Sequence, residues 1–285
     1  MAVGTYALTS LDNLKAWIGV SVATYDAVLE QSIDRSTSIV ESYCDRRFMS
    51  RTFREWVEPK GSDTLTVSHR PIVSVNTVSF GSAQAMSISS DTSTTDVLAT
   101  MGVDEDGLRL HKVASDGTTT TASLAFSTYA TTSALVTQIN SSVSGWTASL
   151  IANAYARTLY RFAGRGVLNA SGIIDYADDN GSDYRVDYDA GEIHLSHDVP
   201  FNSFKPSRFP RGFHPVFVEY EAGYATAPAD LEQATIEIAA DLYRDRLSDR
   251  TLASESLGDY NYSQTSVADL LADRVGKLDA YREIR

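Results

Sequence analysis

A stretch that is poor in charge and rich in hydroxyl side chains divides the sequence. From Ser82 to Ser149 the chain is dense in Ser, Thr and Gly, and Gly117 to Ala156 contains no charged residue at all. Both flanks instead show the amphipathic patterns that are typical of ordinary helices and strands. The sequence therefore predicts a helical module that is interrupted by an inserted β-rich module.

The uncharged stretch does not predict a membrane span. It contains Ser, Thr, Asn and Gln throughout, and it lacks the run of about 18 apolar residues that a membrane-spanning helix needs. The N-terminal segment, Met1 to Leu11, has neither the basic start nor the apolar run of a signal peptide. We expect a soluble, cytoplasmic protein, or part of an assembly made there.

The chain is acidic, which argues against tight DNA binding. It has 37 Asp and Glu against 24 Lys and Arg, a formal net charge of −13, and no basic run longer than a pair. Proteins that hold DNA neutralise its phosphates with clustered Lys and Arg. The imbalance is concentrated in residues 81–199, which carry a net charge of −8.

Four helices are predicted in the flanks. Thr9 and Asp12 have the spacing of a capping box for the first helix, and Gly19 is a natural stop after it. A polar, Gly-containing linker is expected over Ser248 to Thr265, with Ser266 and Asp269 capping the helix that follows. The predicted helices cover Leu11 to Ile18, Asp26 to Arg46, Pro228 to Leu247 and Ser266 to Tyr281.

Strands are predicted on both sides of the insert and within it. Inside the insert, the turn at Asp116-Gly117 should join two of them, and Thr132 to Asn140 should form a short helix. The segment Asp179 to Ser182 reads as a hairpin turn between its neighbouring strands. The predicted strands are Thr52 to Glu58, Thr64 to Val67, Ile72 to Phe80, Leu108 to Val113, Thr121 to Phe126, Trp146 to Ile151, Gly172 to Tyr176, Tyr184 to Tyr188, Glu192 to Leu195 and Val216 to Tyr220.

Few residues suggest chemistry. His194 and His197 point to opposite faces of a strand, so they do not favour a metal site. Asp178 to Asp183 resembles part of a calcium loop, but it lacks the first carboxylate and the final Glu, so a plain turn is the better interpretation. Cys44 is expected to be a small buried hydrophobe. No cofactor, metal or catalytic motif is predicted.

The flanks carry a series of short motifs in a fixed order. By these motifs the chain resembles the head-to-tail connector (adaptor) proteins of long-tailed bacteriophages, over roughly residues 8–80 and 184–285. The motifs are Leu8 to Gly19, Ile39 to Phe48, Arg70 to Val75, Val218 to Tyr224, Pro228 to Ala234, Ala239 to Arg244, Glu255 to Tyr260 and Leu278 to Arg285.

The resemblance implies a fold and an assembly. The fold would be α+β: a helical adaptor core with short strands from residues 1–80 and 184–249, the inserted β-rich module 81–183, and a C-terminal arm 250–285 that ends in a helix. About twelve copies would form a closed ring, a dodecamer, beneath the portal of the virion. DNA would pass through the ring without specific binding, and the ring would be a platform for the next stopper or tail protein.

The arm would reach the portal. An amphipathic helix after a polar linker often docks on a partner. The residues expected to contact the portal protein are Tyr260, Tyr262, Val267, Leu270, Leu271, Leu278 and Tyr281. Compact members of the family lack the insert, which would face capsid, whiskers or a neck protein, or would thicken the ring. The protein would be assembled in the host cytoplasm, with no enzymatic role.

Two alternative functions are open at this point. A virion-surface or glycan-binding component would act through the Ser/Thr-rich insert, and it would need exposed aromatic residues that converge on one face. The aromatic residues available for this are Trp146, Tyr155 and Tyr160. The other alternative is a hydrolase whose catalytic residues form no recognisable sequence motif.

Overall fold

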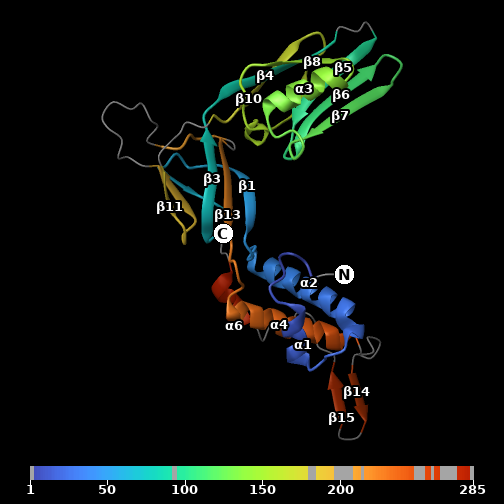
Figure 1. Ribbon diagram of the computed structural model, residues 1–285, viewed down its shortest axis with the longest axis vertical. Helices are drawn as coiled ribbons and strands as arrows, with labels where there is room; N and C mark the ends of the chain where they lie inside the picture. Colours follow the sequence, from blue (N-terminus) through green and yellow to red (C-terminus); the bar gives the residue numbers. More distant parts are fainter. Residues whose placement is uncertain are drawn as a thin grey trace.

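The chain forms an elongated structure, with helices at one end and a β-rich part at the other (Figure 1). This computed structural model describes residues 3–91, 95–178, 184–195, 208–212, 215–246, 254–257, 260–263 and 275–282. The middle of the molecule consists of two three-stranded sheets, which lie between the helices and the β-rich end. No helix among these residues is long and apolar enough to cross a membrane.

The helical end is built from both halves of the sequence. Helices α1 (Leu11–Ile18) and α2 (Asp26–Cys44) come from the first half, and α4 (Ala229–Asp245) comes from the second. The 3₁₀ turn η1 (Ala23–Tyr25) leads into α2. The apolar stripe of α4 packs against α1 and α2, since long amphipathic helices are stabilised mainly by burying one face.

The main central sheet is also shared between the two halves. Its order is β1 (Arg51–Val57), β13 (Val216–Ala222), β3 (Ile72–Phe80), all antiparallel. The middle strand β13 alternates fully buried residues with Glu219 and Glu221 at its C-terminal half. A second sheet has the order β11 (Tyr184–Asp187), β12 (Glu192–Leu195), β2 (Thr64–Thr66).

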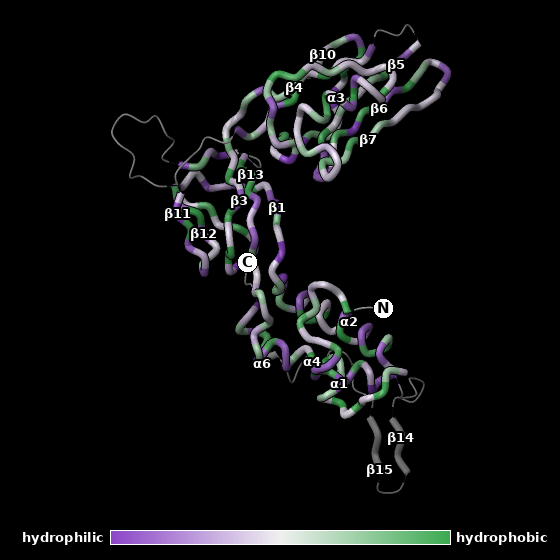
Figure 2. The backbone as a smooth tube through the Cα atoms, viewed as in Figure 1, coloured by the Kyte–Doolittle hydropathy of each residue, from purple (hydrophilic) through white to green (hydrophobic). Residues whose placement is uncertain are grey.

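The β-rich end has two sheets that enclose a core of their own. One sheet has the order β10, β4, β8 and the other β7, β6, β5, β9. Helix α3 (Thr132–Ser142) contributes Leu135 and Ile139 to the core between them. Hydrophobic and hydrophilic residues are mixed along these strands in Figure 2. The strands are β4 (Ala83–Ser90), β5 (Asp96–Val103), β6 (Gly107–Ala114), β7 (Thr119–Ala125), β8 (Trp146–Leu150), β9 (Phe162–Gly166) and β10 (Ser171–Tyr176), with η2 at Ala156–Thr158.

The β-rich end leaves and rejoins the central sheet at a single place. Strand β3 ends at Phe80, and β4 begins at Ala83, directly opposite Tyr176 at the end of β10. The Phe80 N–H donates to the carbonyl of Asp178 over 3.1 Å. Both connections between the β-rich end and the rest of the described chain therefore lie side by side.

The fold class is α+β, as predicted, but strands contribute much more than the expected short decorations of a helical core. Helix α1 and strands β3 and β12 have the predicted bounds, and α2 ends at Cys44 rather than at Arg46. The turn at Asp116-Gly117 joins β6 and β7 as expected, and Gly117 has a φ of 83°.

Three local predictions are wrong. Ser10, not Thr9, caps α1: its side chain accepts the N–H of Asn13, while the Thr9 hydroxyl donates to Glu232. The strands on either side of Asp179 to Ser182 do not pair with each other, because β10 pairs with β4 and β11 with β12.

The third wrong prediction concerns the C-terminal part. The expected linker contains a hairpin, β14 (Ser254–Leu257) with β15 (Tyr260–Ser263). The described end of the expected last helix is helical, with α6 (Val275–Leu278) continuing into the 3₁₀ turn η3 (Asp279–Tyr281). The predicted caps Ser266 and Asp269 lie outside the described residues.

Gly223, between β13 and α4, is a position where only glycine fits. Its φ is +110°, and a Cβ would lie 2.6 Å from the carbonyl oxygen of Phe48. We expect Gly223→Ala to lower the free energy of unfolding by about 2 kcal/mol or more, measured by urea denaturation. Gly166→Ala is the control, because no atom lies within 4 Å of its Cβ position. Equal effects of the two substitutions would contradict this account of the junction.

Candidate assembly site around the C-terminal segment

The end of the chain is seated on the helical end of the molecule. The Leu278 side chain is fully buried, in a cluster that includes Val40 and Cys44 of α2 and Leu231 and Ile238 of α4. Tyr281 is partly buried against the same cluster, and its ring meets Phe48 edge-on with centroids 5.8 Å apart. Residues far apart in the sequence thus form one apolar core around Leu278.

Polar contacts surround this buried leucine. The Tyr43 hydroxyl donates to Asp279 over 2.8 Å, and the Tyr281 hydroxyl donates to Asp230 over 2.7 Å. The Lys277 ammonium lies 3.4 Å from Glu237. Burial and the Asp230 carboxylate raise the pKa of Tyr281 to about 12, because both disfavour the phenolate. The two tyrosines therefore hold α6 and η3 through protonated hydroxyls.

Cys44 lies beneath the C-terminal segment. Its side chain is fully buried, as predicted, and its Sγ is 3.7 Å from the carbonyl oxygen of Leu278. Burial raises the pKa of the thiol to about 11, because the thiolate loses hydration there. Only the thiolate reacts, so Cys44 must be exposed and ionised before a thiol reagent can modify it. The rate of that reaction therefore measures how often the C-terminal segment leaves its place on the helices.

Of the seven residues predicted to contact the portal, two have described side chains. Leu278 is buried against the chain's own helices, and Tyr281 is partly buried there. Tyr260 and Tyr262 belong to strand β15, for which only the backbone is described. Val267, Leu270 and Leu271 lie outside the described residues. In Figure 1 the β14–β15 hairpin extends away from the helices.

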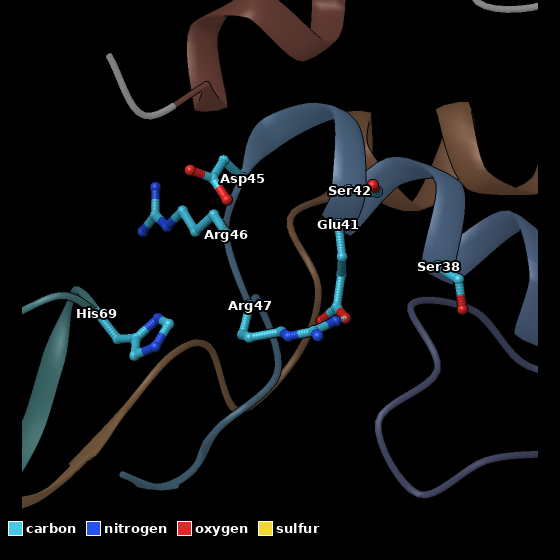
Figure 3. Close-up of a pocket in the computed structure, with 7 residues that line it drawn as sticks. All are labelled: Ser38, Glu41, Ser42, Asp45, Arg46, Arg47 and His69. Atoms are coloured by element: carbon cyan, nitrogen blue, oxygen red, sulfur yellow. Dashed lines mark hydrogen bonds and ion pairs between the residues drawn. The ribbon is translucent and has the colours of Figure 1, made fainter. Parts of the chain in front are cut away.

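A charged pocket lies where α2 ends and the central sheet begins (Figure 3). Glu41, of which 6% is exposed, accepts from the Arg47 guanidinium, from Arg51 over 3.1 Å and from the Phe48 N–H over 3.3 Å. Figure 3 shows the Glu41 and Arg47 side chains meeting inside the pocket. The pocket is lined by Ser38, Glu41, Ser42, Asp45, Arg46, Arg47 and His69.

The pocket connects parts of the fold. Arg46 donates to the carbonyl of Arg70 at the start of the central sheet, and its guanidinium lies over the rings of Phe48 and Tyr224 at 5.4 and 5.8 Å. Sequence reasoning missed this junction. The signal that could have found it is Glu41 near the end of the second helix, followed closely by Arg47 and Arg51. Mixed charge and a buried carboxylate that is already paired suit a structural junction better than a ligand site.

The remaining candidates do not gather into a reaction centre. His194 Nδ1 lies 2.9 Å from the Thr64 hydroxyl and its Nε2 lies 3.3 Å from Glu192, while His197 is outside the described residues, as is Asp179 to Asp183. Within the described part of the chain, no group of three or more His, Cys, Asp or Glu side chains has the arrangement of a metal site.

The aromatic residues considered for a glycan site do not converge on an exposed face. Trp146 is 4% exposed and belongs to the core of the β-rich end. Tyr155 and Tyr160 instead pack with Trp56 and Phe217 against the central sheet. The Tyr155 hydroxyl donates to Glu219 over 3.1 Å, and Tyr160 donates to the carbonyl of Gly81.

Comparison with known proteins gives neighbours in structure alone. No family model matches the sequence, and no curated protein matches it. Three solved structures align with 100% of this chain. The neck of a native GTA particle computed with C12 symmetry is 14% identical, with a TM-score of 0.40 and 93% of that chain covered. The neck of an empty GTA particle computed with C6 symmetry is 13% identical (TM-score 0.36, 95% of that chain), and the virion of a native gene transfer agent (GTA) particle is 14% identical (TM-score 0.36, 94% of that chain).

Two of these structures are necks of GTA particles, and the third is the virion of such a particle. Their identities of 13–14% and TM-scores of 0.36–0.40 are low. The function proposed below therefore rests on the residues of this chain.

Removing the buried leucine should loosen the C-terminal segment. We expect Leu278→Ala to lower the free energy of unfolding by about 2–5 kcal/mol and to speed the reaction of Cys44 with a thiol reagent. The neighbouring exposed Lys277→Ala is the control, and its effect should stay within about 0.5 kcal/mol. An unchanged labelling rate in Leu278→Ala would show that Leu278 does not cover the thiol.

Stability should fall in alkaline solution. The folded-state pKa of Cys44 is raised from 9.0 to about 11, so the unfolded chain loses this proton first as the pH rises. The contribution of the neutral thiol is complete below pH 9 and is lost between pH 9 and about 11. Denaturant titrations at several pH values should show a shallower decline in Cys44→Ala than in the wild type. Parallel declines would contradict the raised pKa.

Proposed function

We propose that this chain is a structural protein of a phage neck, which forms a ring beneath the portal, extends the DNA channel and offers a docking platform to the next neck or tail protein. One observation carries the proposal. The two sequence segments that resemble head-to-tail connector proteins, separated by about a third of the chain, come together as one unit, in which β13 lies between β1 and β3 and α4 packs on α2.

The residues between these segments behave as an addition to that unit. Residues 81–183 would be an inserted module, because its ends lie side by side and it has its own core. The segments 1–80 and 184–249 would form the connector unit, and 250–285 the C-terminal arm. Such an arrangement leaves the connector unit continuous whether or not the insert is present.

Exposed apolar side chains support ring formation. Trp17 of α1 is 50% exposed, and Val22, in the loop before α2, is 53% exposed. Large exposed apolar residues close together often mark contacts with another subunit. In a ring of about twelve copies, this end of each copy would contact a different surface of its neighbour, which is the heterologous contact that closes rings.

The charge of the chain suits a conduit for DNA. With a formal net charge of −13, its surface offers DNA few cationic contacts. Acidic walls repel phosphate and allow passage without retention. We therefore propose that DNA passes through the ring without specific binding, and that the protein has no catalytic role, no cofactor and a location in the virion.

The burial of Leu278 reduces the set of arm residues that could contact the portal. Since this leucine and Tyr281 hold the chain end on α2 and α4, they would anchor the arm. The portal would then be contacted by the part of the arm between Asp245 and Val275. The candidates there are Tyr260, Tyr262, Val267, Leu270 and Leu271.

A double substitution in the arm tests this contact. Leu270→Ser with Leu271→Ser should reduce binding to the purified portal of the same phage by at least about tenfold, because two apolar contacts are lost. Its thermal unfolding should match that of the wild type. Binding is measured by biolayer interferometry on immobilised portal, and unchanged binding would overturn the role of the arm.

Excision of the insert is the matched control. Replacing residues 82–177 by a short Gly-Ser linker joins positions that are already neighbours, as the Phe80–Asp178 hydrogen bond shows. The removal uncovers Trp56 and Phe217, so the variant also needs polar replacements at these two positions. It should still bind the portal. Loss of binding in a folded excision variant would place the portal contact on the insert instead.

A further inference from the structure

The four-stranded sheet of the insert ends at a strand whose outer edge is open. Strand β7 lies at one end of the order β7, β6, β5, β9, and from Thr119 to Ser123 no described residue pairs with its outer side. Two other edges of the insert, those of β8 and β10, are covered. The Asn140 side chain bonds both the N–H and the carbonyl of Ala148 on β8, at 2.8 Å each, and the Tyr160 N–H bonds the carbonyl of Asp175 on β10 at 3.0 Å.

Two hydrogen bonds fix which backbone groups of β7 point outward. The Ala114 N–H donates to the Thr118 carbonyl over 2.9 Å, and the Phe126 N–H donates to the Asp106 carbonyl over 2.8 Å. In an antiparallel pair the bonded residues alternate, so the even-numbered residues of β7 face β6. The N–H and carbonyl groups of Thr119, Thr121 and Ser123 therefore point away from the sheet and are open. At Ala125 the outward carbonyl instead accepts the N–H groups of Thr128 and Tyr129.

Between Thr119 and Ser123 this edge has none of the usual protection against strand addition. Native proteins guard edges with charged residues, proline, bulges or a covering loop. Strand β7 has the sequence Thr-Thr-Thr-Ala-Ser-Leu-Ala, without charge or proline, and it pairs with β6 in unbroken register. Threonine also favours the extended backbone. Strand β7 can therefore pair with an added strand at its outer edge.

The charges at the two ends of the edge define that neighbour. Asp116 lies in the turn before β7, and Asp106 lies beside the end of β7, where it accepts the Phe126 N–H. Both are exposed, and neither has an ion-pair partner among the described residues. Nearby, Asp104 and Glu105 are already matched by Arg109 and Arg161.

We propose that the outer edge of β7 binds an extended segment of another protein, an uncharged strand flanked by Lys or Arg at both ends. The backbone of Thr119 to Ser123 supplies hydrogen bonds, and Asp106 and Asp116 select the basic flanks. A second copy of the chain fits less well. Antiparallel pairing of two β7 strands about Ala122 brings Asp116 of one copy toward Asp106 of the other, and like charges there are destabilising.

Synthetic peptides test this surface on the full-length protein. The probe is a fluorescent peptide of seven alternating Thr and Val residues with two lysines at each end, and its match has two glutamates at each end. Fluorescence anisotropy should show at least about tenfold tighter binding of the lysine peptide. Equal affinities, or no binding of the lysine peptide, would overturn the proposal.

Two variants show whether the backbone edge is the contact. Thr121→Pro removes an outward N–H without touching the bonds to β6, so the protein should fold while losing at least about tenfold in affinity for the lysine peptide. Thr121→Val keeps the N–H and should keep the affinity. Undiminished binding by a folded Thr121→Pro variant overturns the proposal.

Self-association gives an independent outcome. Concentration-dependent dimers of the wild type that disappear in Thr121→Pro would place a second copy on this edge and also overturn the proposal. These measurements involve neither portal nor ring, so their failure would leave the proposed neck function untouched.

Discussion

The structure depends on the burial of strand β13 between β1 and β3. Val216, Phe217, Val218, Tyr220 and Ala222 are all buried, so this strand contributes apolar side chains to both faces of the central sheet. Its partners come from before the insert, and β13 itself comes from after it. Because the strand leads through Gly223 into α4, the same segment also brings α4 onto α2. The insert is consequently carried by a unit that the two flanks complete together.

Paired charges join the helices to this sheet. Glu41 on α2 binds Arg47, Arg51 and the Phe48 N–H, and Arg51 begins β1. On the sheet, Arg54 donates to Glu219 over 2.6 Å. A buried carboxylate with several donors costs little only when every partner is in place, so this junction has one well-defined geometry. A fixed angle between helices and sheet is what a subunit of a closed ring requires.

Sequence patterns predicted the elements well where local signals were strong. The apolar spacing of α2 predicts that helix, the alternation in β3 predicts that strand, and Asp116-Gly117 predicts the turn between β6 and β7. The pairing of strands was not predictable, because β10 and β11 flank a turn-like segment yet belong to different sheets. The sequence pattern places Leu278 on the apolar face of an amphipathic helix that is expected to contact a partner. Its burial depends on Val40 and Leu231, which no local pattern relates to it. The open edge of β7 is likewise invisible in sequence, because it follows from the order of strands.

The central claim is that the two flanks form one subunit of a ring that stacks on the portal. Electron microscopy of the purified chain mixed with the portal of the same phage tests it most directly. The account predicts a ring of this chain lying coaxially under the portal, with the β-rich insert directed away from the axis. A chain that remains an unbound monomer at concentrations well above those of assembly would contradict it.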